Sequence, residues 1–190
     1  MPLLEDYLFP AMWLGYMAYW WAMSRNVKAT EQRESAASRL ARLVAIACAA
    51  ALLWLPSVPI PFLNERFLPH GALCFWSGAG LTAGGLLFSV WGRSHLGENW
   101  SQAVTVKEGH ELITSGPYGL VRHPIYTGLL LGFLGSAVAR GEWRGLVSVA
   151  LVFGTLLHKL SLEEKWMRAE FGQSYEAYSR RVAALVPYIL

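Results

Sequence analysis

Long apolar stretches alternate with polar stretches along the whole chain. A helix needs about 20 apolar residues to cross the hydrocarbon core of a bilayer. The pattern predicts five membrane-crossing helices, over about 7–24, 40–55, 68–91, 124–139 and 145–160. The last two are joined by the short polar turn 140–144, so they are expected to form a helical hairpin.

Two longer polar stretches interrupt this pattern, over 93–123 and 163–181. The second carries an apolar stripe at helical spacing, which predicts a helix lying at the membrane interface; its members are Met167, Phe171, Tyr175, Tyr178 and Val182. The expected fold is therefore an all-α, integral membrane helical bundle. It forms a single domain over 1–190, with three N-terminal helices in 1–92 and the main polar segments in 93–190.

Composition agrees with a membrane protein and disagrees with a soluble one. The chain is 54% hydrophobic and 15% charged, whereas a soluble domain is about 25% charged. A net charge of +3 is too small to indicate binding to nucleic acid. Cys48 and Cys74 lie inside apolar segments without metal or disulfide spacing, so we expect no metal site.

Basic residues are distributed unequally between the two sides that five crossings create. Of the 16 Lys and Arg residues, all but three fall in the first and third connecting segments and in the tail. The exceptions are Arg66, Arg140 and Arg144. Basic segments stay in the cytoplasm, so the pattern predicts an external N-terminus and a cytoplasmic C-terminus. Both long polar stretches would then face the cytoplasm.

Small residues recur at intervals of four in the third and fourth apolar segments. Gly80 and Gly84 form one such pair, and Gly128 and Gly132 form another. Spacing of this kind lets helix backbones approach closely in lipid. We expect these glycines to pack helices together rather than to bind a ligand.

The first candidate ligand-binding residues lie at the start of the fourth apolar segment. Pro124 suits the first position of a helix, where its missing N–H would have had no partner. The amides that follow, with Arg122 beside them, predict a site for an anionic group. Taken alone, the Arg122–Pro124 segment is also typical of an ordinary capped helix with a basic anchor.

A pair of carboxylates, Glu163 and Glu164, follows the fifth apolar segment. Adjacent helical residues point about 100° apart, so one carboxylate can face a pocket while the other faces solvent. A carboxylate suits ribose hydroxyls or an ammonium group. Lys159 lies one turn earlier on the same face as Glu163. By themselves these residues are also typical of a solvated helix end.

Several short motifs occur together in a fixed order between about 96 and 187. They are Gly97–Trp100 (GENW), His110–Ile113 (HELI), Gly116–Tyr118 (GPY), Arg122–Tyr126 (RHPIY) with Gly128, Glu163–Glu164, Phe171–Gly172, Tyr175, Tyr178 and Val186–Pro187. This ordered set, which covers half of the chain, resembles the isoprenylcysteine carboxyl methyltransferase family, which is grouped with the phospholipid N-methyltransferases.

The resemblance implies a membrane enzyme with S-adenosylmethionine as methyl donor and S-adenosylhomocysteine as product. It makes 93–190 the donor-binding half. The residues that it implies for contact with the donor are His110, Glu111, Leu112, Ile113, Tyr118, His123, Pro124, Ile125, Tyr126 and Glu163. Lys159 falls on the substrate side, where the eukaryotic enzymes have an arginine. The two side chains are not equivalent for binding a carboxylate.

The implied reaction is an in-line displacement onto a lipophilic acceptor in the membrane, either isoprenylcysteine carboxylate-like or phospholipid-like. Such a reaction depends on positioning, so Arg122 and Glu164 are positioning candidates and no catalytic base is named. Two alternatives stay open. One is an NADPH-dependent sterol-type reductase, since such enzymes share a His-Pro-x-Tyr helix start. The other is a non-enzymatic membrane scaffold.

Overall fold

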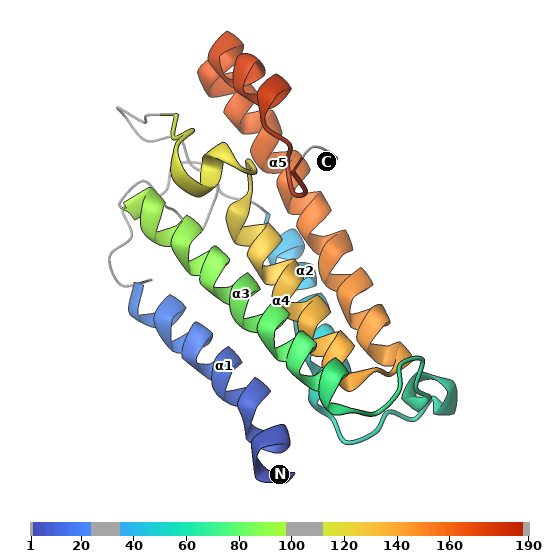
Figure 1. Cartoon of the computed structure of the whole chain (residues 1–190). Helices are drawn as coiled ribbons and strands as arrows, with labels where there is room; N and C mark the ends of the chain where they lie inside the picture. Colours follow the sequence, from blue (N-terminus) through green and yellow to red (C-terminus); the bar gives the residue numbers. More distant parts are fainter. Residues whose placement is uncertain (1, 24–34, 98–111, 188–190) are drawn as a thin grey trace.

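Long helices run roughly lengthwise beside one another in the computed structural model (Figure 1). The structure describes residues 2–23, 35–97 and 112–187. The helices are α1 (Pro2–Met23), α2 (Ala36–Trp54), α3 (Ala72–Leu96), α4 (Pro124–Arg140) and α5 (Trp143–Arg181), with the short 3₁₀ helices η2 (Pro61–Asn64) and η4 (Gly116–Gly119) between them. α4 packs between α3 and α5, while α1 lies along α3 and α2 along α5.

Three of these helices, α2, α3 and α5, are long and apolar enough to cross a membrane. α4 is shorter, with 17 residues. Large apolar side chains face outward along the bundle; Leu73 is 83% exposed and Leu87 is 67% exposed. A soluble protein rarely exposes so much apolar surface, whereas lipid accommodates it. The protein is therefore an all-helical membrane bundle, as the apolar pattern predicts.

Local signals that hydrophobicity does not report shift several helix ends from their predicted positions. α2 begins at Ala36 rather than near residue 40, because the Ser35 side chain caps its first turn by accepting a hydrogen bond from the Ser38 amide at 3.2 Å. α3 begins after Pro69 and Gly71 and continues to Leu96, beyond its predicted end near 91. α2 at its start and α3 at its end thus extend into regions that we expected to be loops, whereas α3 begins later than the predicted position near 68.

The contact between α3 and α4 depends on glycines seven residues apart. Gly78 and Gly85 on α3 face Gly135 and Gly128 on α4. A Cβ placed on Gly85 would lie only 2.6 Å from the Gly128 carbonyl oxygen, which is closer than a methyl group can approach. Seven residues make nearly two helical turns, so both glycines of each helix lie on one face and the two backbones touch.

The predicted packing role is wrong for Gly80 and Gly84. An added Cβ at either position would meet nothing within 4 Å, because both residues lie on the outward side of α3. On α4, Gly132 does serve packing, since a Cβ there would lie 3.3 Å from the Trp13 ring of α1. A spacing of four marks a helix face but does not say which neighbour that face meets.

The end of the bundle opposite the predicted polar site is held by arginines of the α4–α5 turn. Glu142 is paired with Arg140 at 3.3 Å and also with Arg144. The buried Arg144 guanidinium donates to the carbonyls of Leu55 at 2.7 Å and Pro56 at 3.2 Å. The last carbonyls of a helix need partners from outside it, so this turn caps the end of α2.

α5 does not end with the apolar stretch at Leu160 but continues through the acidic segment to Arg181. Gly172, with a φ of 49°, breaks the helix, and the chain then folds back (Figure 1). After the break, Tyr175 and Tyr178 are 2% and 3% exposed. These two members of the predicted interfacial stripe therefore pack against the protein rather than against lipid.

Candidate functional site

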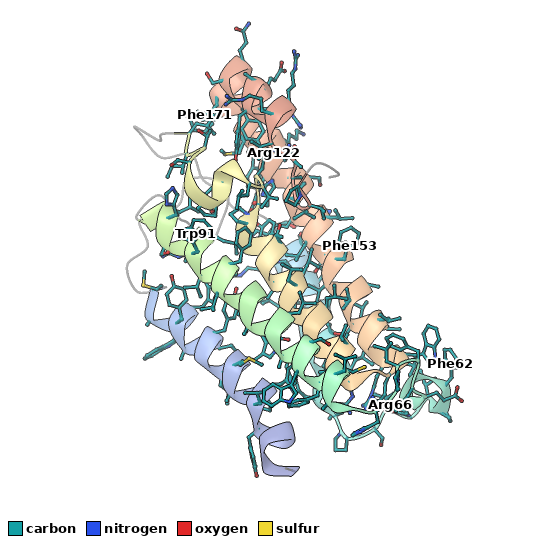
Figure 2. All side chains as sticks on the ribbon, viewed as in Figure 1. Phe62, Arg66, Trp91, Arg122, Phe153 and Phe171 are labelled. Carbon is teal, nitrogen blue, oxygen red and sulfur yellow. The ribbon has the colours of Figure 1, made fainter. Side chains whose placement is uncertain are left out.

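The start of α4 and the polar part of α5 meet at one end of the bundle. Figure 2 shows Arg122 at this end, far from Arg66 and Phe62 at the other. The two segments are about 40 residues apart in sequence, and the hairpin formed by α4 and α5 brings them together. The side chains of Arg122, His123, Glu163 and Glu164 are all largely buried there.

Glu163 is bonded to three side chains from two helices. Its carboxylate lies 3.4 Å from His123 Nδ1 and 3.5 Å from Lys159 Nζ, and it accepts a hydrogen bond from the Tyr126 hydroxyl. The rings of His123 and Tyr126 are stacked with centroids 5.5 Å apart. Lys159 also lies 5.4 Å from the centre of the Tyr126 ring. Glu163 is thus surrounded by aromatic and cationic groups.

Glu164 faces a second set of partners, because adjacent helical residues diverge. The Arg122 guanidinium donates to it from Nε at 2.8 Å and from a terminal nitrogen. Arg168, one turn later on α5, pairs with its other oxygen at 2.8 Å. His123 Nε2 lies 3.4 Å away. The His123 ring therefore bridges the two carboxylates, with one nitrogen toward each.

The segment that follows α5 lies against the start of α4. The backbone amides of Arg122 and His123 donate to the carbonyls of Ala183 and Ala184 at 2.8 and 3.0 Å. The Thr127 hydroxyl donates to the Leu185 carbonyl at 2.7 Å. The Arg122 guanidinium also donates to the carbonyls of Ser179 and Val182. The predicted fixed charge at Arg122 is therefore used to join three chain segments.

These contacts favour the charged form of the central histidine. Burial alone would lower the pKa of His123, but its bonds to Glu163 and Glu164 raise that pKa above the ordinary value of 6.5. Burial alone would raise the pKa of Glu164, but the bonds from His123 and Arg122 lower it to about 2. Both shifts favour a positive charge on His123 and a negative charge on Glu164.

The raised pKa of His123 predicts a pH-dependent stability. The folded protein binds this proton more tightly than the unfolded chain, so the stabilisation is complete below pH 6.5 and is lost as the pH rises through the folded-state pKa. We expect the thermal midpoint in detergent to decrease as the pH rises above 6.5, and the His123→Gln variant to lack this decrease. An identical pH profile for wild type and variant would contradict the protonation of His123.

The other residues that were predicted to contact the donor differ in their position and burial. Tyr118 is buried in η4, where its hydroxyl donates to the Gly92 carbonyl at 3.3 Å. Leu112 and Ile113 precede η4 and are partly buried. Pro124 occupies the first turn of α4 as predicted, and Ile125 packs against the core. The predictions for His110 and Glu111 lie outside the described residues.

Several residues that complete the site were not predicted. Arg168 has a sequence signal, because it lies four residues after Glu164 on one helix. Tyr178, which the pattern assigned to an interfacial stripe, donates from its hydroxyl to the Tyr118 carbonyl at 2.6 Å. His95 pairs with Ser115 at 3.0 Å. The carbonyls of 183–185 carry no sequence signal, since every residue has one.

The fold and the site together define a helical membrane protein with a buried charged cluster at one end of its bundle. Carboxylates, an imidazolium and aromatic faces within one cluster suit a small ligand that combines charged groups with hydroxyls. A model of the phospholipid methyltransferase family matches residues 73–174, which span α3, η4, α4 and most of α5. The match covers more than half of the chain, and the chain belongs to the phospholipid methyltransferase family.

The names of similar proteins support the resemblance to isoprenylcysteine carboxyl methyltransferases. The protein-S-isoprenylcysteine O-methyltransferase of Schizosaccharomyces pombe is 32% identical over 96 residues, which are 49% of this chain and 41% of the relative. The probable enzyme of the same name from Oryza sativa subsp. indica is 36% identical over 84 residues, 44% of each chain. A methanethiol S-methyltransferase of Crocosphaera subtropica is 36% identical over 72 residues, 38% of this chain and 28% of the relative.

The motif-based resemblance is confirmed by these similarities. The matched segments cover less than half of each relative's own length. α1 and α2 lie outside the segment that the family model matches.

Proposed function

We propose that this protein transfers a methyl group from S-adenosylmethionine to a lipophilic acceptor at the membrane, by direct in-line displacement. The observation that carries the proposal is the convergence of His123, Tyr126, Glu163 and Glu164 at one end of the bundle. Family membership and the names of the relatives, which include O- and S-methyltransferases, support the same reaction class.

The side chains present fit the proposed donor. It has an ammonium, a carboxylate, ribose hydroxyls, an adenine and a sulfonium. Glu163 is suited to the ammonium or the ribose hydroxyls, since ionised carboxylates accept strong hydrogen bonds. The face of Tyr126 is suited to a sulfonium, because aromatic rings attract cations. By resemblance, His110, Glu111, Leu112, Ile113, Tyr118, His123, Pro124 and Ile125 complete the donor contacts.

Bound S-adenosylmethionine supplies a methyl group activated by its positive sulfur. The task of the protein is therefore to hold the donor in line with the acceptor and to exclude water. Arg122 and Glu164 serve as positioning residues, because their ion pair joins the start of α4 to α5. A carboxylate acceptor attacks without losing a proton, so no residue is assigned as a base for it. The amine of a phospholipid-like acceptor would have to lose a proton before it attacks.

The acceptor is proposed to be isoprenylcysteine carboxylate-like or phospholipid-like. Lys159 lies beside both Glu163 and Tyr126, so a group bound to it would lie next to the donor-binding residues. Outward-facing apolar side chains on the bundle would let a lipid tail reach this position from the bilayer.

We also propose that all five helices cross the membrane, with the N-terminus outside and the site on the cytoplasmic side. The charge distribution supports this orientation. The donor is a cytosolic metabolite, and the proposed orientation gives it direct access to the charged cluster.

Calorimetry on the detergent-solubilised protein tests the reaction class. We expect S-adenosylhomocysteine to bind and NADPH not to bind. Binding of NADPH alone would indicate a sterol-type reductase, and binding of neither would favour a scaffold. Labelled methyl transfer to a lipid extract in sealed vesicles then tests orientation: product should form only when the donor is on the cytosolic face.

A further inference from the structure

Tyr178 lies in the segment that folds back after α5 breaks at Gly172. It belongs to the ordered motifs of the sequence, and it lies beyond residue 174, where the match to the family model ends. Its side chain is 3% exposed, and its hydroxyl donates to the Tyr118 carbonyl at 2.6 Å. The fold-back of the chain therefore brings a buried side chain of the tail onto η4.

Tyr118 is held at three points. Its carbonyl accepts the Tyr178 hydroxyl, and its own hydroxyl donates to the Gly92 carbonyl of α3 at 3.3 Å. Its ring is stacked on His95, also of α3, with centroids 6.4 Å apart. η4 is thus fixed between the end of α3 and the fold-back segment.

These contacts matter because η4 has four residues. A helix of that length is not stable by itself, so its position depends on the elements that it packs against. The Tyr178 hydroxyl is one of the contacts that supply this support, and a single substitution can remove it without changing the backbone.

The same fold-back segment also holds the start of α4. The carbonyls of Ala183 and Ala184 accept the backbone amides of Arg122 and His123. By resemblance, η4 and the start of α4 both carry residues that contact the donor, with Tyr118 on the first and His123 beside the second. One segment therefore fixes the two donor-binding elements relative to each other.

We propose that Tyr178 is a positioning residue for the donor site. Its hydroxyl holds η4 beside the start of α4, and the affinity for the donor depends on this contact. The inference rests on the proposed function. It assigns a part in donor binding to the fold-back segment, through Tyr118 rather than through direct contact with the donor.

The first test is Tyr178→Phe, which keeps the ring and leaves the buried Tyr118 carbonyl without this donor. η4 should then be displaced for part of the time, and the apparent affinity of a ligand falls with the fraction of protein that is competent to bind it. We expect S-adenosylhomocysteine to bind about fivefold more weakly, as for the loss of one hydrogen bond, in calorimetry on detergent-solubilised protein. Tyr7→Phe removes the hydroxyl of a 65% exposed tyrosine near the start of α1, at the other end of the bundle, and should bind like wild type.

Hydrogen exchange measured by mass spectrometry distinguishes positioning from a general contribution to stability. In Tyr178→Phe without ligand, we expect the amides of 112–121 to exchange faster than in wild type, while those in the middle of α3 and α4 are unchanged. Saturating S-adenosylhomocysteine should return 112–121 to the wild-type rate, because the ligand selects the docked position of η4. A residue that merely stabilises the fold would accelerate exchange throughout the bundle.

Wild-type affinity in Tyr178→Phe would overturn the inference and leave the proposed function intact. Faster exchange spread evenly over the bundle, or faster exchange in 112–121 that the ligand does not slow, would also overturn it. If wild type itself did not bind S-adenosylhomocysteine, the proposed function would fail, and the role of Tyr178 in donor binding would fail with it.

Discussion

Replacing Glu163 with alanine is expected to weaken the binding of S-adenosylhomocysteine by about tenfold or more. The substitution removes the carboxylate that receives Tyr126, His123 and Lys159. It also leaves the partly buried Lys159 without its described carboxylate partner and leaves His123 with Glu164 alone, and a buried charge that loses its partner is unfavourable. Isothermal titration calorimetry on purified variants measures the change directly.

Two further variants test whether the negative charge of Glu163 is responsible for this loss of affinity. Glu163→Gln keeps an acceptor for Tyr126 but cannot balance Lys159, so we expect an intermediate loss. Glu176→Ala removes an exposed carboxylate from the same helix and should bind like wild type. Wild-type affinity in Glu163→Ala, with the protein folded, would mean that the donor site lies elsewhere.

Replacing Gly85 with alanine is expected to destabilise the bundle by about 3 kcal/mol, at the upper end of the cost of overpacking. The added methyl group would lie 2.6 Å from the Gly128 carbonyl oxygen and 2.7 Å from the Gly132 amide nitrogen. Both are backbone atoms, so they cannot move aside without separating α3 from α4. Equilibrium unfolding in mixed detergent micelles measures the loss.

The adjacent glycine is a matched control for this substitution. Gly84→Ala introduces the same methyl group one position earlier, where nothing lies within 4 Å. We expect its effect to stay within about 0.5 kcal/mol, as for substitutions away from close packing. If the two variants were equally stable, the direct backbone contact between α3 and α4 would be contradicted.

Gly85→Ala and Glu163→Ala together also test whether the α3–α4 contact supports the donor site. α4 carries the glycines that touch α3 along its length and His123 at its start. We therefore expect Gly85→Ala to weaken donor binding as well, whereas Glu163→Ala should leave the α3–α4 contact intact.

Much of the site was predictable because its residues lie close together in two short segments. A proline at a helix start has one favourable position, and Pro124 begins α4 as expected. Lys159 and Glu163 are four apart on one helix, and the structure pairs them at 3.5 Å. Such local relations follow from helix geometry alone.

The long-range part of the site was not predictable in the same way. Arg122 was expected to stand beside the α4 amides as a charge for a ligand, but it is bonded to Glu164 and to carbonyls at the end of α5. Those carbonyls become available because Gly172 breaks the helix and directs the chain back. No side-chain pattern indicates where a backbone carbonyl will lie.

The sequence by itself determined the all-helical membrane fold, the approximate helices and the two segments that carry the chemistry, because apolar length and residue type act locally. Only the tertiary structure decided which glycines touch and that the chain after α5 folds back against the start of α4. Each of these depends on the rotation and register of one helix against another. That geometry is set by the packing of the whole bundle, so no single segment contains it.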